Sequence, residues 1–447
     1  MPASNPTAAL TNERVTLRRT LGLSGLILYG IIVIQPTAPM PVFGVIYTEA
    51  RGHVVTAVLL AMIAMLLTAV SYGHMARLHP QAGSAFTYVG KELHPAGGYL
   101  AGWCMAMDYV LNPLICTIWC SKAAQNFVPG VPYVIWAIGF ATMFTLLNLN
   151  GVETSARLNA ALAAALGLVI LMFVVAALRF AMRNGLYGDW RNFTLPFYDP
   201  RTFSPPAVLH GTSLAVLTYI GFDGITTLSE EAHDPERNVP RAVVLTCLVT
   251  GILAGIEVYL GQIVWGHSGA FPEIDTAFVH VAARAGGPAL FIAVNAALLV
   301  ATIGSGMGAQ LGAARLLYAM GRDGALPARF FGAIEPRKRI PRNNVLLIGV
   351  VSLIGALLIT YETGAELLNF GALLAFMGVN LASVRHSLRF QERERGTLVV
   401  FGISGFLICL LLWLNLSTLG KIAGSSWAFL GILLWFARRR TMKEVEG

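Results

Sequence analysis

The sequence predicts an all-α polytopic membrane protein, from its composition, its long apolar segments and the prolines that interrupt the first of them. Of its 447 residues, 56% are hydrophobic and only 12% are charged, about half the charged fraction of a soluble domain. Segments long enough to cross a hydrocarbon core of about 30 Å recur about twelve times. We expect spans near 21–47, 53–78, 97–121, 132–150, 159–182, 206–229, 241–266, 288–318, 344–361, 364–384, 397–416 and 423–437.

Basic residues indicate the orientation of these spans. If both termini are cytoplasmic, the cytoplasmic segments hold 23 of the 31 lysines and arginines, as the positive-inside rule requires. We therefore expect a multi-pass plasma (bacterial inner) membrane protein with a cytoplasmic tail at each end (1–20 and 438–447). Between the tails we expect a transporter core over 21–385 and two peripheral helices over 396–437.

We expect the protein to contact the lipid bilayer, and we expect no cofactor, metal ion or nucleic-acid partner. The five cysteines all lie in apolar runs without metal-ligand spacing, which favours core packing. The chain is also too apolar for nucleic-acid binding. An enzyme is not expected, because the GxSG match at Gly22–Gly25 has no obvious base in reach.

The first span carries an interruption at its middle. The stretch YGIIVIQPTAPMPVFG contains Pro36, Pro39 and Pro41, and proline removes a backbone donor and clashes with the preceding helical turn. Backbone groups freed by a break cannot face lipid, so they face protein or a water-filled cavity. Many transporters build their substrate site at such a break, although a packed proline kink is the alternative.

A second interruption is expected in the sixth span, where Gly221 and Gly224 flank Asp223. Glycine in a helix interior costs roughly 1 kcal/mol relative to alanine. If the first and sixth spans open two five-helix halves (about 21–182 and 206–385), the two breaks occupy corresponding positions in inverted repeats. Paired breaks of this kind indicate a transporter binding site.

Three segments resemble those of the amino acid–polyamine–organocation (APC) superfamily. They are YIGFDGITTLSEEAHDPERNVPRAV in the sixth span, ARLLYAMGRDGALPARF after the eighth, and YGHMARLHPQAGSAFTYV after the second. The resemblance implies a LeuT-like five-plus-five inverted repeat with two peripheral helices and with the first and sixth spans broken.

The motifs IQPTAPMPVFG, MDYVLNP and GFDGITTLSEE are similar to those of bacterial putrescine importers. Amino acid carriers of the superfamily usually have a Gly-rich triplet in the first break that holds the substrate carboxylate. Here Pro36-Thr37-Ala38 stands there, which favours an amine without an α-carboxylate. The resemblance implies secondary active import of a putrescine-like amine by alternating access. An amino acid permease is the alternative, and a channel or sensor is a less favoured one.

The candidate site residues come from the two breaks and from acids deep in spans. A buried ammonium needs an anion, and intramembrane acids are functional candidates by default; Asn112 shares a helical face with Asp108. The expected substrate-binding residues are Ile34, Gln35, Pro36, Thr37, Ala38, Asp108, Asn112, Tyr219, Ile220, Gly221, Phe222 and Asp223. Tyr219 as plain packing is nearly as good an interpretation. For Asp223 the alternative is that it hydrogen-bonds the unwound backbone and never titrates.

Coupling and gating have their own candidates. Asp108, Asp223 and Glu257 could carry a coupling proton, which we prefer to sodium because Thr302 and Ser305 are the only obvious hydroxyls for a sodium site in the eighth span. Glu257 could equally make an interhelical bond. The candidates for an inner gate are Glu230, Glu231 and Arg237, although a solvated loop explains these charges equally well.

Overall fold

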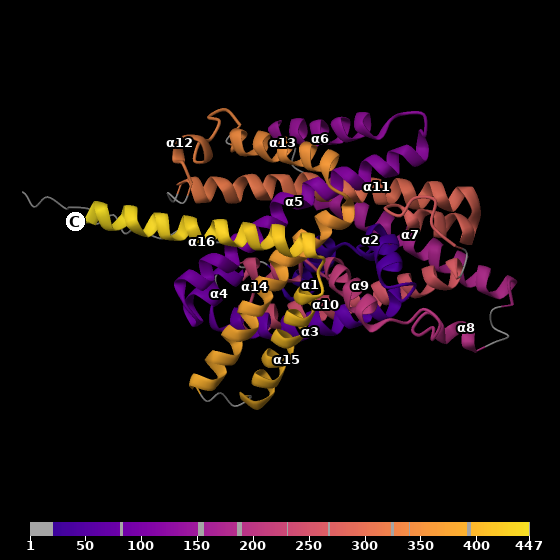
Figure 1. Ribbon diagram of the computed structural model, residues 1–447, viewed down its shortest axis with the longest axis horizontal. Coiled ribbons are helices and arrows are strands. Elements are labelled where there is room, and N and C mark those ends of the chain that lie inside the picture. Colours follow the sequence, from indigo (N-terminus) through magenta and orange to yellow (C-terminus); the bar gives the residue numbers. More distant parts are fainter. Residues whose placement is uncertain are drawn as a thin grey trace, which may run out of the picture.

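The computed structural model describes residues 21–80, 84–150, 156–185, 190–229, 231–266, 269–322, 326–338, 340–390 and 395–446. Within these ranges the protein is a bundle of helices without β-strands (Figure 1). Among the described residues, nine helices are long and apolar enough to span a membrane, and a tenth span is a helix pair bent by 54°. Two shorter apolar helices, α6 (Tyr133–Leu149) and α13 (Arg342–Leu358), complete the match to the expected spans.

The first half of the chain begins with the bent pair. It consists of α1 (Leu23–Ile34), α2 (Pro39–Glu49), α3 (Val54–Leu78), α4 (Ser84–Glu92), α5 (Pro95–Phe127), α6 and α7 (Ala156–Arg183). The short helix α4 packs against α5 and α14. The segment between the second and third expected spans therefore contains a helix of its own.

The second half begins with the interrupted sixth span. The short α8 (Arg191–Thr194) precedes this span. The second half consists of α9 (Pro205–Ala215), the 3-10 helices η2 (Val216–Thr218) and η3 (Phe222–Leu228), α10 (Pro235–Trp265), α11 (Ala277–Arg322), α12 (Ala328–Phe331), α13 and α14 (Tyr361–Phe390). Gly287, at φ 74°, kinks α11 just before Pro288. This kink explains why the expected eighth span begins there, since proline cannot continue a regular helix.

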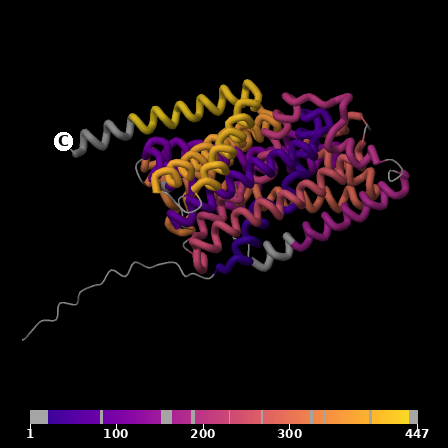
Figure 2. Tube along the Cα trace, turned by 90° about the horizontal axis from the view of Figure 1, so that it is seen from below, coloured from indigo at the N-terminus to yellow at the C-terminus, as the bar shows by residue number. Residues whose placement is uncertain are grey.

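The last two helices are α15 (Arg395–Leu414) and α16 (Thr418–Glu446). In Figure 2 they lie along one side of the bundle (yellow), and α7 (magenta) lies along the opposite side. The helix α16 continues to Glu446, past the expected boundary at 437, and projects beyond the other helices in Figure 1.

Small residues and buried amides hold the central helices together, as is usual where lipid removes a hydrophobic driving force. A Cβ on Gly371 of α14 would lie 2.2 Å from the Cys104 carbonyl oxygen of α5, so only glycine fits this crossing. The Asn369 side chain donates to the Ser213 carbonyl oxygen at 2.8 Å. This bond ties α14 to the end of α9, next to the break in the sixth span.

Candidate substrate-binding site

The first span is broken as the prolines predict. Helix α1 ends at Ile34, Gln35 takes a left-handed φ of 69°, and α2 begins at Pro39. Pro39 suits a helix start because the missing amide there would have no helical partner. The Gln35 side chain donates to the Ala301 carbonyl oxygen in α11 at 3.3 Å. The break is thus attached to the eighth span.

Few backbone amides of this break are available to a ligand. Pro36, Pro39 and Pro41 have none. The Gln35 amide donates to the Ile31 carbonyl oxygen, and the amides of Ala38 and Met40 donate within the turn itself. From residue 35 to residue 41 this leaves only the amide of Thr37.

The sixth span is also broken, and its break lies against the first. The regular helix α9 ends at Ala215, and Tyr219–Gly221 is non-helical between η2 and η3. Gly221 has φ 121°, and a Cβ there would lie 3.1 Å from Val33 Cγ1 and 3.3 Å from Ile34 Cγ1. Backbone amides of Gly221 and Gly224 lie within hydrogen-bonding reach of the Asp223 carboxylate.

A cavity of about 520 Å³ lies at the two breaks, a size typical of small-molecule sites. The expected site residues that line it are Gln35, Pro36, Asp108, Asn112, Ile220, Gly221 and Asp223. A smaller cavity of about 100 Å³ is lined by Ile34, Gln35, Ala38, Asn112 and Ile220, together with Thr302 and Ser305. The two cavities share four lining residues and therefore adjoin.

The cavity lining is acidic. Asp108 and Asp223 both face the larger cavity and are close enough to interact electrostatically. None of the described residues that line either cavity is a lysine, arginine or histidine. Because a buried carboxylate needs a compensating cation, this arrangement fits a ligand that brings positive charge with it.

Comparison with known proteins identifies the family. The sequence profile of the amino acid permease family matches residues 41–433. The chain belongs to this family. Its relatives include the low-affinity putrescine importer PlaP of Escherichia coli (strain K12), 32% identical over 427 residues and 94% of each chain. The branched-chain amino acid permease BcaP of Bacillus subtilis (strain 168) is 25% identical over 98% of this chain and 97% of its own length. The methylthioribose transporter of the same organism is 25% identical over 97% of this chain and 96% of its own.

Membership of a permease family makes this chain a membrane transporter and not an enzyme. The helices of the described chain agree with a multi-pass protein of the LeuT-like class, with the first and sixth spans broken. The resemblance to the APC superfamily is therefore confirmed.

Polar and aromatic residues that sequence reasoning did not select also line the permease's cavities. Tyr29, Tyr109 and Thr227 face the larger cavity, and Trp119 and Tyr361 face the smaller one. Tyr109 follows Asp108 directly, which is the one sequence signal that could have marked it. The others come from helix faces that only the packing reveals.

Three of the expected contact residues point elsewhere. Thr37 is 1% exposed and lines neither cavity. The Tyr219 hydroxyl donates to the Val58 carbonyl oxygen at 2.9 Å, and the Phe222 ring packs edge-on against Tyr72. The structure thus gives Tyr219 and Phe222 packing roles, because the non-helical turn directs their side chains into the core.

The remaining candidates lie away from the cavities. Glu257 of α10 is 1% exposed, and its carboxylate oxygens have no hydrogen-bond partner within the described residues. Arg237 is exposed, and no ion pair joins it to Glu231 in the part of the chain described. Instead, the Glu231 carbonyl oxygen accepts from the Leu21 amide at 3.1 Å. Glu230 lies outside the described residues.

Only one half of each broken span lines the larger central cavity. Its lining includes Tyr29, Ile32 and Val33, which precede the first break, and Gly224 and Thr227, which follow the second. No residue of α2 or α9, the opposite halves of the broken spans, lines it. The cavity is therefore placed on the side of the bundle from which α1 starts.

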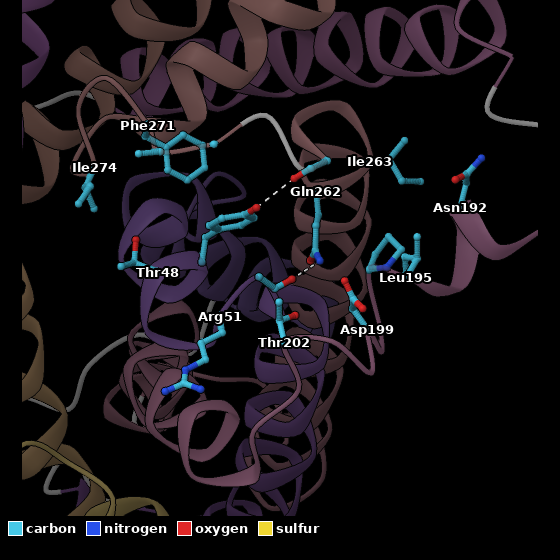
Figure 3. Close-up of a pocket in the computed structure, with 16 residues that line it drawn as sticks. Thr48, Arg51, Asn192, Leu195, Asp199, Thr202, Gln262, Ile263, Phe271 and Ile274 are labelled. Atoms are coloured by element: carbon cyan, nitrogen blue, oxygen red, sulfur yellow. Dashed lines mark hydrogen bonds between the residues drawn. The ribbon is translucent and has the colours of Figure 1, made fainter.

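Another cavity, of about 690 Å³, lies elsewhere, between the end of α2, the α8 segment and the end of α10. In Figure 3 two hydrogen bonds frame it, from the Tyr47 hydroxyl to the Gly266 carbonyl oxygen (3.0 Å) and from Gln262 to the Gly52 carbonyl oxygen. None of the expected site residues lines this cavity. Its size alone does not make it the substrate site.

Proposed function

We propose that this permease is a secondary active importer of a small organic amine, with a putrescine-like diamine as the substrate that fits best. The single observation that carries the proposal is the pair of carboxylates, Asp108 and Asp223, in a cavity whose described lining has no basic side chain. A diamine brings two positive charges to these two carboxylates. Aromatic rings such as Tyr109 can add cation–π attraction.

The backbone of the first break supports an amine in preference to an amino acid. A substrate carboxylate would need several free amides, and prolines and internal hydrogen bonds leave only that of Thr37. The putrescine importer relative is consistent with this preference. The alternative is an amino acid permease, which the branched-chain amino acid relative favours.

Transport would occur by alternating access between two inverted repeats, 21–182 and 206–385, with the helices of 396–437 at the periphery. Both termini would lie in the cytoplasm of a cell whose plasma (bacterial inner) membrane holds the protein, so the central cavity would open inward. Glu231 and Arg237 would then lie beside the inner opening and could pair when it closes.

A proton is the proposed coupling ion. Asp108 and Asp223 could exchange it for the substrate's ammonium groups, and the unpartnered carboxyl of Glu257 is a third candidate. Sodium is the alternative, since the side chains of Thr302 and Ser305 line the smaller cavity beside the first break. Uptake into proteoliposomes with a proton gradient or a sodium gradient imposed separately distinguishes the two ions.

Thermal stabilisation of the detergent-purified protein tests the substrate. A ligand that binds only the folded state adds about 2.7 kcal/mol at 100 times its Kd. Diamines, monoamines and amino acids form the panel. We expect putrescine to raise the melting temperature and amino acids to leave it unchanged. Stabilisation by an amino acid alone would overturn the amine proposal and favour the permease alternative.

A further inference from the structure

Three helices bring metal-ligating side chains together in the halves of the broken spans that do not line the larger central cavity, and at the start of α14. Glu49 is the last residue of α2, His210 lies in α9 and Glu362 is at the start of α14. One ligand atom from each lies within 4.8 Å of the other two. The Nε2 atom of His210 lies 3.4 Å from Glu49 Oε2, close to the separation of about 3.3 Å between two ligands of a tetrahedral zinc ion.

The His210 ring is oriented for ligation. Its Nδ1 atom lies 2.8 Å from the Asn415 carbonyl oxygen. A carbonyl only accepts, so Nδ1 carries the proton and the lone pair of the neutral ring is on Nε2. Metal-binding histidines are usually fixed in this way, by a hydrogen bond from the nitrogen that does not ligate.

The cluster also has more negative charge than the chain itself neutralises. Glu366 Oε1 lies 3.7 Å from His210 Nε2, and the Glu366 side chain is 2% exposed. Ser417 holds the Glu366 carboxylate through its amide and hydroxyl. In the described chain no lysine or arginine forms an ion pair with Glu49, Glu362 or Glu366. Three carboxylates around one imidazole call for an added cation.

We infer that Glu49, His210 and Glu362 form a site for a divalent transition-metal ion of the zinc class. An imidazole with carboxylates suits such ions, whereas calcium and magnesium prefer oxygen ligands alone. The bound ion would join α2 and α9, which are the halves of the two broken spans that do not line the larger central cavity. It would hold that side closed.

The consequence for transport rests on the proposed alternating access, but metal binding does not. If α2 and α9 must separate from α14 to admit substrate, the ion inhibits uptake from that side. Binding can be measured on the full-length protein without any amine present. Failure of the metal site and failure of the amine proposal are therefore distinguishable.

The test is metal binding by the detergent-purified full chain, followed through thermal stabilisation by Zn²⁺ and through the visible absorption of bound Co²⁺. We expect both signals in the wild type and at least a 10-fold loss of Zn²⁺ affinity in His210→Gln and in Glu362→Gln, since even indirect partners of a ligand change affinity about 10–100-fold. The matched control is His280→Gln, a half-buried histidine of α11 outside the cluster, which should bind as the wild type does.

Further outcomes decide the inference even if one variant fails to fold. His210→Cys should favour Cd²⁺ over Zn²⁺ more strongly than the wild type does, because thiolate is the softer ligand. Equal Zn²⁺ stabilisation of the wild type, Glu362→Gln and His280→Gln would overturn the site. The site would also be overturned if no metal signal were seen and the stability of the protein responded only to pH. That result would mean that a proton alone neutralises the cluster.

Discussion

Gly221 of the sixth span lies directly against Ile34 of the first, with only 3.3 Å between the position of a Cβ on Gly221 and Ile34 Cγ1. The two breaks are therefore in contact with each other. Their proximity explains why residues from both breaks line one cavity next to Asp108 and Asp223.

Gly221→Ala should lower both stability and transport. A side chain at φ 121° is strained, at about 1–3 kcal/mol, and its Cβ would also crowd Val33 at 3.1 Å. The melting temperature and putrescine uptake are the measurements. Gly224→Ala is the matched control for the melting temperature, because nothing lies within 4 Å of a Cβ there. Equal effects of the two substitutions would contradict the close contact between the breaks.

Asp108→Asn and Asp223→Asn should each weaken amine binding about 10-fold or more. Each removes a charged partner of an ammonium group, and hydrogen bonds to charged groups contribute about 1.5–3 kcal/mol. Putrescine affinity is measured by titration, and uptake in proteoliposomes. The exposed Glu236→Gln is the charge-matched control. Full binding and transport by both aspartate variants would remove the proposed site.

Tyr219→Phe should lower stability by about 1 kcal/mol, because it removes the buried hydrogen bond that the Tyr219 hydroxyl donates to the Val58 carbonyl oxygen. Amine affinity should not change, since Tyr219 lines neither cavity. Tyr109→Phe is the comparison variant. Tyr109 is 41% exposed and its hydroxyl has no hydrogen bond among the described residues, so the melting temperature of Tyr109→Phe should match that of the wild type. Weaker amine binding in Tyr219→Phe at unchanged stability would show that Tyr219 contacts the substrate after all.

Glu92→Gln should make stability less dependent on pH. Burial raises the pKa of Glu92, but hydrogen bonds from His79 and His386 outweigh it and hold the pKa below its usual value of 4.5. A lowered pKa contributes stability that is present above pH 4.5 and is lost as the pH falls through the folded-state pKa. The His79 Nε2 atom lies 2.7 Å from Glu92 Oε1, so α4 is tied to the end of α3.

Melting temperatures of the wild type and Glu92→Gln between pH 7 and pH 4 test this relation. We expect the variant to be less stable at pH 7 and the difference to shrink as the pH falls below 4.5. Glu236→Gln, exposed to solvent, should follow the wild type at every pH. A constant difference between wild type and Glu92→Gln would mean that the carboxylate's charge does not matter there.

The sequence by itself determined the spans and the two breaks. Apolar length and the chemistry of Pro36, Pro39 and Gly221 act locally, so these features can be read without knowing what packs against them. The acids of the cavity could also be predicted, because a carboxylate such as Asp108 is costly inside a membrane and rarely stands there without a role.

Only the tertiary structure decided which side chains face the cavity and which meet across helices. Tyr219 and Phe222 lie in the predicted break, yet the direction of a non-helical turn sends them into the core. Glu49, His210 and Glu362 come together although they lie far apart in the chain. Side-chain direction and the meeting of helices far apart in the chain depend on packing between elements, which local sequence patterns do not encode.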